Sequence, residues 1–385
     1  MHVTAVELEN WRNFRRLPRT RVPDRLFVIG PNASGKSNFL DVFRFLRDVA
    51  LPVGRRPGPG GLQAAVRDRE GLPKVRSLYA HGKPGVRISV DLADGETTWS
   101  YTLAFRGEGK GKNRIVVSKE LVEKSGKVLL SRPDANDDAD PELLTQTALE
   151  NMSRNKAFRS ISQFFADVTY LHLVPQLVKY GERIGGTKLE HDPFGQAFLE
   201  RIAETPERTR DSRLNRIQAA LANVVPEFQK LRFEADPIDG RPHLFAEFEH
   251  WRPNAAKQRE RQFSDGTLRL IALFWSILEG NSLLLLEEPE LSLDEEVVRS
   301  IGRLLRKVQR ANKAQRQLLI TTHSEALLDG ADLEDDEVLR LAPGRDGTTT
   351  RPLGPEERAM VKGGFSVGAT MLRSTKAPVQ LSLLE

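Results

Sequence analysis

The sequence contains no cysteine, which excludes disulfide bonds, thiolate zinc sites and cysteine nucleophiles. It also has no run approaching the roughly 18 consecutive apolar residues that indicate a membrane-spanning helix. The opening residues, MHVTAVELENWRNF, alternate like a strand and lack the apolar centre of a signal peptide. Sustained heptads are missing, so no long coiled coil is expected. Together these absences predict a cytoplasmic protein with no membrane segment.

What is present fits a globular chain of two or three subdomains, with 385 residues, 39% of them hydrophobic and 29% charged. The formal net charge is only +5, but arginine is concentrated in two stretches, 11–21 (WRNFRRLPRTR) and 54–76. Such stretches can bind the phosphates of a nucleic acid. An ordinary solvated surface explains each of them equally well, so both interpretations remain open.

The strongest motif is GPNASGKS at residues 30–37, which matches G-x-x-x-x-G-K-[ST] at every fixed position. An apolar strand (LFVI, 26–29) precedes it and an amphipathic helix follows, which a chance glycine-rich turn would lack. Glycine lets the backbone approach phosphate, and the helix start offers N–H groups and a positive dipole end. Lys36 is expected to reach the β- and γ-phosphates of ATP, and Ser37 to bind Mg²⁺. The predicted nucleotide-binding residues of this loop are Gly30, Pro31, Asn32, Ala33, Ser34, Gly35, Lys36, Ser37 and Asn38.

A second motif, SLLLLEEPELSLD at 282–294, ends an apolar run on two adjacent acids. The run suits a buried strand of a parallel sheet. Two neighbouring carboxylates repel each other unless they lie on a solvated rim or hold a cation. Because the phosphate loop implies a magnesium nucleotide, we expect Glu287 to face Mg²⁺ and Glu288 to polarise the attacking water.

The periodicity predicts an α/β P-loop NTPase fold with a mixed or parallel core sheet, an antiparallel β subdomain and a helical lobe. Strands are expected at 3–9, 25–29 and 168–176, and an antiparallel sheet over 86–130. Helices are expected over about 142–166 and 193–225, followed by a hairpin at 231–248 and βα alternation over 266–329. A last hairpin is expected at 336–353, with a short helix and a tail after it.

The order of the motifs resembles the ABC-type ATPase head. A strand ending in Gln176 comes after the phosphate loop, then FSDGTLR (263–269), then the acid strand with SLD (292–294), and finally TTHS (321–324). The EEPE acid strand, the opening NWRNF and the β-rich insertion are most similar to the SMC, RecF and OLD (overcoming-lysogenization-defect) branch, particularly to OLD-like ATPases.

This resemblance implies a role for each matching residue. Lys36, Glu288 and His323 would be catalytic, with His323 as the switch histidine, and the Mg²⁺ ligands would be Ser37, Gln176 and Glu287. The signature residues that contact the partner subunit's γ-phosphate would be Ser264, Asp265 and Gly266. Ser292 and Asp294 would form the D-loop, and Arg12 or Phe14 would lie beside the base.

The resemblance also implies a division of the chain. The ATPase core would comprise 1–50, 168–180 and 263–354, the antiparallel insertion 80–130, the helical and signature lobe 190–250, and a tail 355–385. The stretch after His323 is too short for the Toprim nuclease domain of OLD proteins, so we expect a head without its own nuclease.

The predicted reaction is hydrolysis of Mg-ATP to ADP and phosphate, with ATP joining two heads head-to-tail in a homodimer or higher homo-oligomer. The expected biological role is action on DNA, on a separately encoded effector such as a nuclease, or on both, in anti-phage defence. A RecF-like DNA repair ATPase is the alternative, and the ATP-binding subunit of a transporter is a less favoured one.

Overall fold

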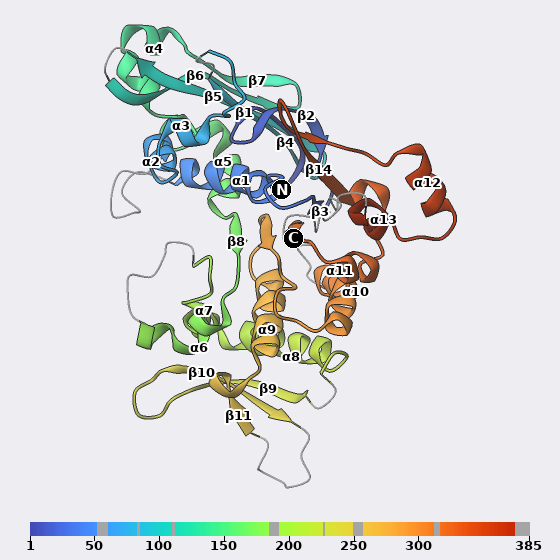
Figure 1. Ribbon diagram of the computed structural model, residues 1–385. Coiled ribbons are helices and arrows are strands. Elements are labelled where there is room, and N and C mark those ends of the chain that lie inside the picture. Colours follow the sequence, from blue (N-terminus) through green and yellow to red (C-terminus); the bar gives the residue numbers. More distant parts are fainter. Residues whose placement is uncertain are drawn as a thin grey trace, which may run out of the picture. The chain divides into compact units, whose positions relative to one another are not determined.

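The computed structural model describes residues 1–51, 61–82, 85–109, 112–184, 192–225, 228–248, 257–311 and 316–373 (Figure 1). Part of the arginine-rich stretch 54–76 and the end of the predicted tail lie outside the described residues. The chain divides into two compact units. Unit 1 comprises Met1–Val168, Gln317–His323 and Glu334–Glu385, and unit 2 comprises Thr169–Arg316 and Ser324–Leu333.

Unit 1 contains a six-stranded antiparallel sheet with the strand order β2-β1-β4-β5-β6-β7. Its strands are β1 (His2–Trp11), β2 (Phe14–Arg21), β4 (Val86–Asp94), β5 (Thr97–Gly109), β6 (Lys112–Lys124) and β7 (Lys127–Arg132). The period-two pattern of 86–130 is confirmed, because Val86, Ile88 and Val90 are buried while the residues between them are partly exposed. The opening strand β1 pairs antiparallel with β4 of this sheet.

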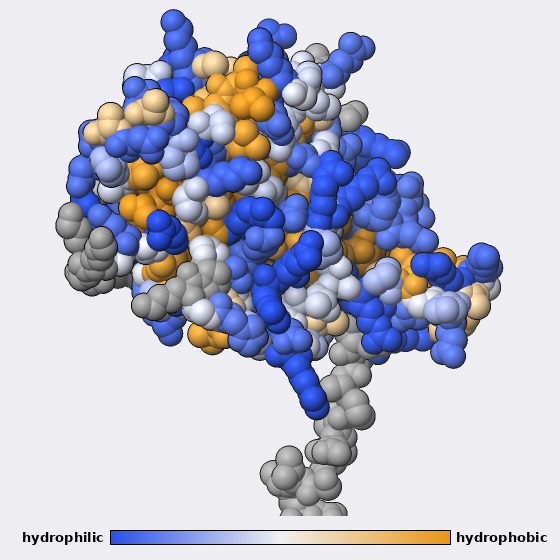
Figure 2. All heavy atoms as spheres, turned by 90° about the horizontal axis from the view of Figure 1, so that it is seen from above, coloured by the Kyte–Doolittle hydropathy of each residue, from blue (hydrophilic) through white to orange (hydrophobic). Residues whose placement is uncertain are grey.

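Strand β2 was not predicted, because FRRLPRTR has few apolar residues and contains a proline. It lies at the edge of the sheet, where Pro18 removes no hydrogen bond from a central ladder. The chain enters β2 through a tight turn in which Arg12 has φ 47°. Figure 2 views the molecule from above and shows hydrophilic side chains interspersed with apolar patches.

Five helices accompany this sheet: α1 (Lys36–Ala50), α2 (Gly61–Arg67), α3 (Leu72–Val75), α4 (Ala135–Ala139) and α5 (Arg159–Ala166). Helix α1 packs on the sheet through aromatic rings, with Phe45 stacked on Phe105 at 5.3 Å and tilted against Trp11 at 5.2 Å. All three rings are fully buried, and each such side chain stabilises the fold by about 2–3 kcal/mol. The helices expected over 142–166 are shorter in the structure: two 3₁₀ turns, η1 (Pro141–Thr145) and η2 (Lys156–Phe158), precede α5.

A second sheet region in unit 1 carries the phosphate loop. Strand β3 (Arg25–Ile29) is buried at every residue and lies between two parallel partners, β13 (Leu318–Thr321) and β14 (Val338–Gly344). Strand β15 (Gly347–Thr350) pairs antiparallel with β14, which confirms the last hairpin. The turn η4 (Asp335–Glu337) precedes β14, and two helices follow the hairpin rather than one, α12 (Pro355–Lys362) and α13 (Val367–Arg373).

In unit 2, β8 (Thr169–Leu171) and β12 (Leu284–Glu287) are parallel neighbours. A three-stranded sheet is formed by β9 (Phe228–Ala235), β10 (Pro242–Phe248) and β11 (Lys257–Arg259), with the 3₁₀ turn η3 (Glu260–Gln262) after it. The helices are α6 (Pro175–Ile184), α7 (Phe198–Glu204), α8 (Glu207–Leu221), α9 (Asp265–Leu278), α10 (Glu295–Ala311) and α11 (Glu325–Gly330).

The strand predicted at 168–176 was wrong in its length. It ends at Leu171, and Pro175 begins helix α6, where a missing N–H costs no helical hydrogen bond. Gln176 therefore lies in the first turn of a helix. Among the described residues, no helix combines the length and the apolar character that crossing a membrane requires.

Candidate nucleotide-binding and hydrolysis site

The phosphate loop turns sharply between β3 and α1, as the motif predicts. Ser34 N donates to Pro31 O at 3.2 Å, and Ala33 and Gly35 have φ values of 60° and 98°. Gly35 occupies the cap position of α1 and has no side chain that could cap the N–H groups in the first turn of this helix. Those N–H groups have no intrahelical acceptor, so the loop offers several donors and a positive dipole end to an anion.

The Lys36 side chain folds over this loop and is buried. Its Nζ donates to the carbonyl oxygens of Gly30 at 3.1 Å and Pro31 at 3.2 Å. An ammonium held by loop carbonyls lies next to the N–H groups of the helix start. The loop therefore gathers positive charge at one place, as a phosphate-binding site requires.

Asn13, in the β1–β2 turn, contacts the loop directly, and sequence reasoning missed it. Its Nδ2 donates to Ser34 O at 2.9 Å, and its Oδ1 accepts from Asn38 Nδ2 at 2.9 Å. The motif NWRNF drew attention to the neighbouring Arg12 and Phe14 instead. The partner in the loop is 21 residues away, so no local pattern pointed to it.

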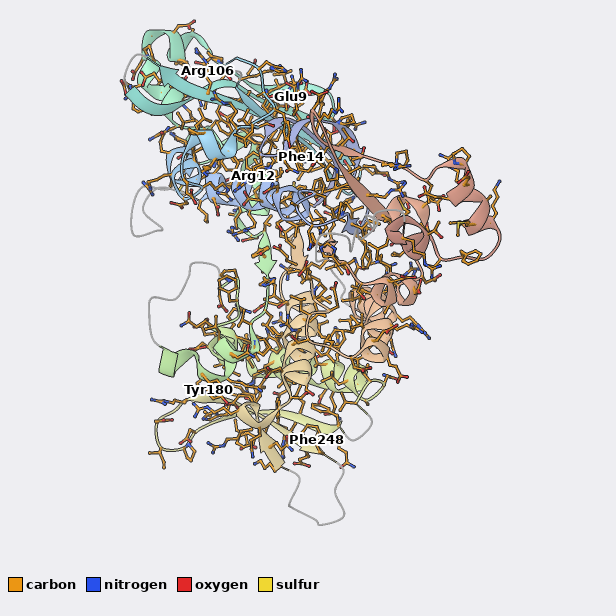
Figure 3. The ribbon with its side chains drawn as sticks, viewed as in Figure 1. Glu9, Arg12, Phe14, Arg106, Tyr180 and Phe248 are labelled. Atoms are coloured by element: carbon orange, nitrogen blue, oxygen red, sulfur yellow. The ribbon has the colours of Figure 1, made fainter. Side chains whose placement is uncertain are left out.

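Arg12 and Phe14 have other surroundings in the structure (Figure 3). The Arg12 guanidinium donates to Asp41 at 2.6 Å, and Phe14 is fully buried. Contact of either residue with a base stays a prediction, and for Phe14 it would require the ring to leave the core.

Behind α1 lies a buried ion network that fixes the helix. Asp41 accepts from Arg69 at 2.8 Å as well as from Arg12, and Arg69 also pairs with Asp48 at 3.0 Å. Burial alone would raise the pKa of Asp41, but Arg69 and the neighbouring arginines outweigh it and lower the pKa to about 2. The carboxylate is therefore ionised at neutral pH and holds α1 against its neighbours.

His323 follows β13 and is exposed. Since β13 runs parallel to β3, both strands end at the same edge, and Thr322 N donates to Val28 O at 3.3 Å there. The predicted switch histidine thus leaves the sheet at the edge from which the phosphate loop also departs.

The acid strand lies in unit 2. Glu287 is the last residue of β12, and its carboxylate accepts from Tyr170 Oη at 2.5 Å, while its carbonyl oxygen lies 3.3 Å from His172 Nδ1. Both partners come from the neighbouring β8 segment and were not predicted. Glu288 has φ 44°, a left-handed conformation that is uncommon for a residue with a side chain.

The signature segment begins helix α9. Ser264 caps the helix by accepting from Thr267 N at 3.0 Å. Asp265 accepts from Lys179 Nζ at 2.6 Å and from Gln176 Nε2 at 2.8 Å. A Cβ atom at Gly266 would lie 2.9 Å from Leu293, so glycine permits close contact with the segment after the acid strand. Gln176, predicted to bind Mg²⁺, is thus bonded to the signature aspartate here.

The predicted D-loop leads into helix α10. Asp294 accepts from Glu296 N at 2.9 Å, which satisfies one donor of the helix start, and Ser292 has φ 63°. The predicted site residues therefore fall into two groups. Unit 1 holds the phosphate loop, Arg12 and His323, and unit 2 holds Gln176, Glu287, Glu288 and the signature and D-loop residues.

Comparison with known proteins agrees with this geometry. The crystal structure of an SmcHead bound to the C-winged helix domain of ScpA has a TM-score of 0.54 at 14% identity, with 93% of this chain and 100% of that chain covered. A Pyrococcus furiosus Smc head domain with an extended coiled coil, bound to the C-terminal domain of ScpA, has a TM-score of 0.50 at 12% identity, with 94% and 99% covered. At such identities these likenesses show the fold, an α/β SMC-head-like P-loop fold.

No curated protein sequence matches the chain. A protein-family model does, over residues 26–329, and its description is "AAA domain, putative AbiEii toxin, Type IV TA system". The matched range contains the phosphate loop, the signature segment, the acid strand and His323. The chain belongs to this family of AAA-domain, ABC-type P-loop ATPases.

Proposed function

We propose that this protein binds Mg-ATP on the phosphate loop and hydrolyses it to ADP and phosphate. The observation that carries the proposal is the loop itself, with Gly35 as the cap residue of α1 and a buried Lys36 ammonium beside it. Both features favour a polyphosphate over a neutral ligand.

Each remaining site residue receives a role. The Ser37 hydroxyl and the Glu287 carboxylate hold Mg²⁺, with Gln176 as a further ligand, and such hard oxygen donors suit this ion. In the proposed complex the nucleotide phosphates would supply the other ligands of the ion. Bound Mg²⁺ supplies charge neutralisation at the β- and γ-phosphates. Glu288 orients and polarises the attacking water, and His323 contacts the γ-phosphate.

We further propose that ATP joins two copies of the chain head-to-tail. Ser264 and Gly266 of one copy then contact the γ-phosphate bound by the other. The start of α9 supports this proposal, because a helix N-terminus favours an anion and the charge of Asp265 in its first turn is already paired with Lys179.

The biological output that we propose is control of a separately encoded effector in anti-phage defence. The family description, which names a putative toxin of a type IV toxin–antitoxin system, supports this role. A RecF-like role on DNA is the second candidate, and the exposed arginines of β2 favour it. Three of these, Arg15, Arg19 and Arg21, already pair with aspartates, which leaves less free charge for a phosphate backbone.

Phosphate release by the purified full chain tests the enzymatic proposal. Glu288→Gln should lower turnover by roughly 10²–10³-fold, because it removes the group that polarises water. It should also accumulate an ATP-bound dimer, seen by light scattering on a sizing column. Glu296→Gln, an identical change at an exposed helix start, is the matched control and should behave as wild type. Wild-type turnover in Glu288→Gln, with no dimer on ATP addition, would contradict the assignment.

A further inference from the structure

The carbonyl oxygen of Ser34, in the middle of the phosphate loop, accepts two side-chain hydrogen bonds. One comes from Asn13 Nδ2 at 2.9 Å and the other from Thr348 Oγ1 at 2.8 Å. Asn13 lies in the β1–β2 turn and Thr348 in β15, so both lie outside the residues 26–329 that the family model covers. Two distant segments of the chain thus meet on a single carbonyl group.

The hydrogen bonds around this carbonyl are consistent with one another. Asn38 Nδ2 donates to Asn13 Oδ1, which fixes the orientation of the Asn13 amide. Asn13 Nδ2 then uses its two N–H groups on Ser34 O and, at 2.6 Å, on Thr348 Oγ1. The Thr348 hydroxyl accepts this bond and donates its only proton to Ser34 O. Each donor is used once, as the inventory of amide and hydroxyl groups requires.

These hydrogen bonds fit only because glycine occupies two positions next to Asn13. A Cβ atom at Gly35 would lie 2.0 Å from Asn13 Nδ2, and one at Gly347 would lie 2.7 Å from Asn13 O. Thr348 N also donates to Asn13 O at 2.8 Å. Gly35 therefore has a structural reason beyond phosphate contact, because it admits the amide that supports the loop.

The consequence for the loop follows from peptide geometry. Ser34 C=O and Gly35 N–H belong to one planar trans peptide, in which the two groups point in opposite directions. Two donors that hold the carbonyl on the protein side must therefore direct the Gly35 N–H to the other side. Backbone N–H groups of such loops are the ones that cradle phosphate.

We propose that Asn13 and Thr348 are positioning residues for nucleotide binding, which hold the Ser34–Gly35 peptide so that its N–H faces the phosphates. The proposal rests on the proposed function. It adds that two residues, one near each end of the sequence, hold the phosphate loop in its binding conformation. Its expected signature is a loss of affinity for ADP and ATP alike, since both carry the phosphates that this loop would bind, with little change in turnover at saturation.

Titration with fluorescent MANT-ADP and MANT-ATP tests it on the full chain. Thr348→Val should weaken both nucleotides roughly 3–10-fold and Asn13→Asp roughly 10–100-fold, because a carboxylate cannot donate to Ser34 O. Thr348→Ser keeps the hydroxyl and should restore binding. The double variant Asn13→Asp/Thr348→Val should lose less than the product of the single effects, because both act on one carbonyl.

Two matched controls separate positioning from a general effect. Thr349→Val makes the same change one residue along β15, at an exposed position, and Asn215→Asp makes the same change on the exposed face of α8. Both should bind as wild type. Wild-type affinity in Thr348→Val, or equal weakening in Thr348→Ser and Thr348→Val, would overturn the proposal even if Asn13→Asp failed to fold. If the wild-type chain binds neither nucleotide, the proposed function itself fails, which is a separate result.

Discussion

The phosphate end of unit 1 and the acid-strand end of unit 2 differ in what their hydrogen bonds fix. In unit 1, side chains of Asn13, Lys36 and Thr348 hold backbone carbonyls of the loop in place. In unit 2, the side chains of Ser264 and Asp294 accept from backbone N–H groups and cap the starts of helices α9 and α10. In the first region side chains fix the backbone of a loop, whereas in the second they fix the starts of helices. We therefore expect changes at the residues that hold the phosphate loop to alter affinity or stability, and changes at Glu288 or at the start of α9 to alter turnover.

Lys36→Met should have the largest effect of these variants, and we expect this effect on the affinity for ATP. The ammonium makes charge-assisted contacts with phosphate, so its loss should weaken ATP roughly 100-fold or more, about 3 kcal/mol. Equilibrium binding of MANT-ATP measures this, with circular dichroism to show that the fold is retained. An unchanged affinity would place the nucleotide elsewhere.

Asp41→Asn tests whether the buried ion network behind α1 stabilises the folded protein. The change removes the carboxylate between Arg12 and Arg69 and leaves two guanidinium groups poorly compensated, so we expect a loss of about 3 kcal/mol in the free energy of unfolding. The wild-type pKa near 2 predicts that about 2 kcal/mol is present above pH 4 and is lost as the pH falls toward 2. Urea unfolding at pH 7 and pH 3 measures both.

Asp91→Asn is the matched control. It breaks a surface ion pair with Arg19 and should lower the free energy of unfolding by less than about 1 kcal/mol.

Glu150→Gln tests a buried carboxyl group that forms no ion pair with any of the residues described in the structure. Burial raises the pKa of Glu150 to about 7, and the nearby Glu120 adds to this, against the N–H groups of Thr147 and Leu62. Because the folded-state pKa lies above the unfolded one, stability is full below pH 4.5 and falls by up to about 3 kcal/mol as the pH rises past 7. Glutamine imitates the protonated acid, so the variant should be more stable than wild type at pH 8 and show a flatter pH profile. Equal slopes for the two proteins would refute this.

Lys179→Met should have the smallest effect on the free energy of unfolding, but it should lower turnover. The ion pair with Asp265 is partly exposed on the aspartate side, so its loss should cost less than about 1 kcal/mol. Without it, the start of α9 is held less firmly, and we expect kcat to fall a few-fold with KM for ATP unchanged. A raised KM with unchanged kcat would remove the distinction between the two units.

How far the sequence predicts this molecule depends on the range of the interactions concerned. The phosphate loop, β4 to β7 and the acid strand follow from local motifs and periods, and the structure confirms these elements. Strand β2 and the helical start at Pro175 were missed because edge position and proline geometry outweigh composition there. Thr348 bonds to Ser34 across 314 residues, and no pattern in one sequence shows such a contact.

The proposed mechanism assigns ATP binding to the phosphate loop and activation of the attacking water to Glu288. This assignment can be tested in a single-turnover experiment, in which Glu288→Gln protein is in excess over labelled ATP. Bound nucleotide and released phosphate are followed in the same samples. We expect wild-type binding with cleavage slowed roughly 10²–10³-fold. Loss of binding in this variant, or cleavage at the wild-type rate, would contradict it.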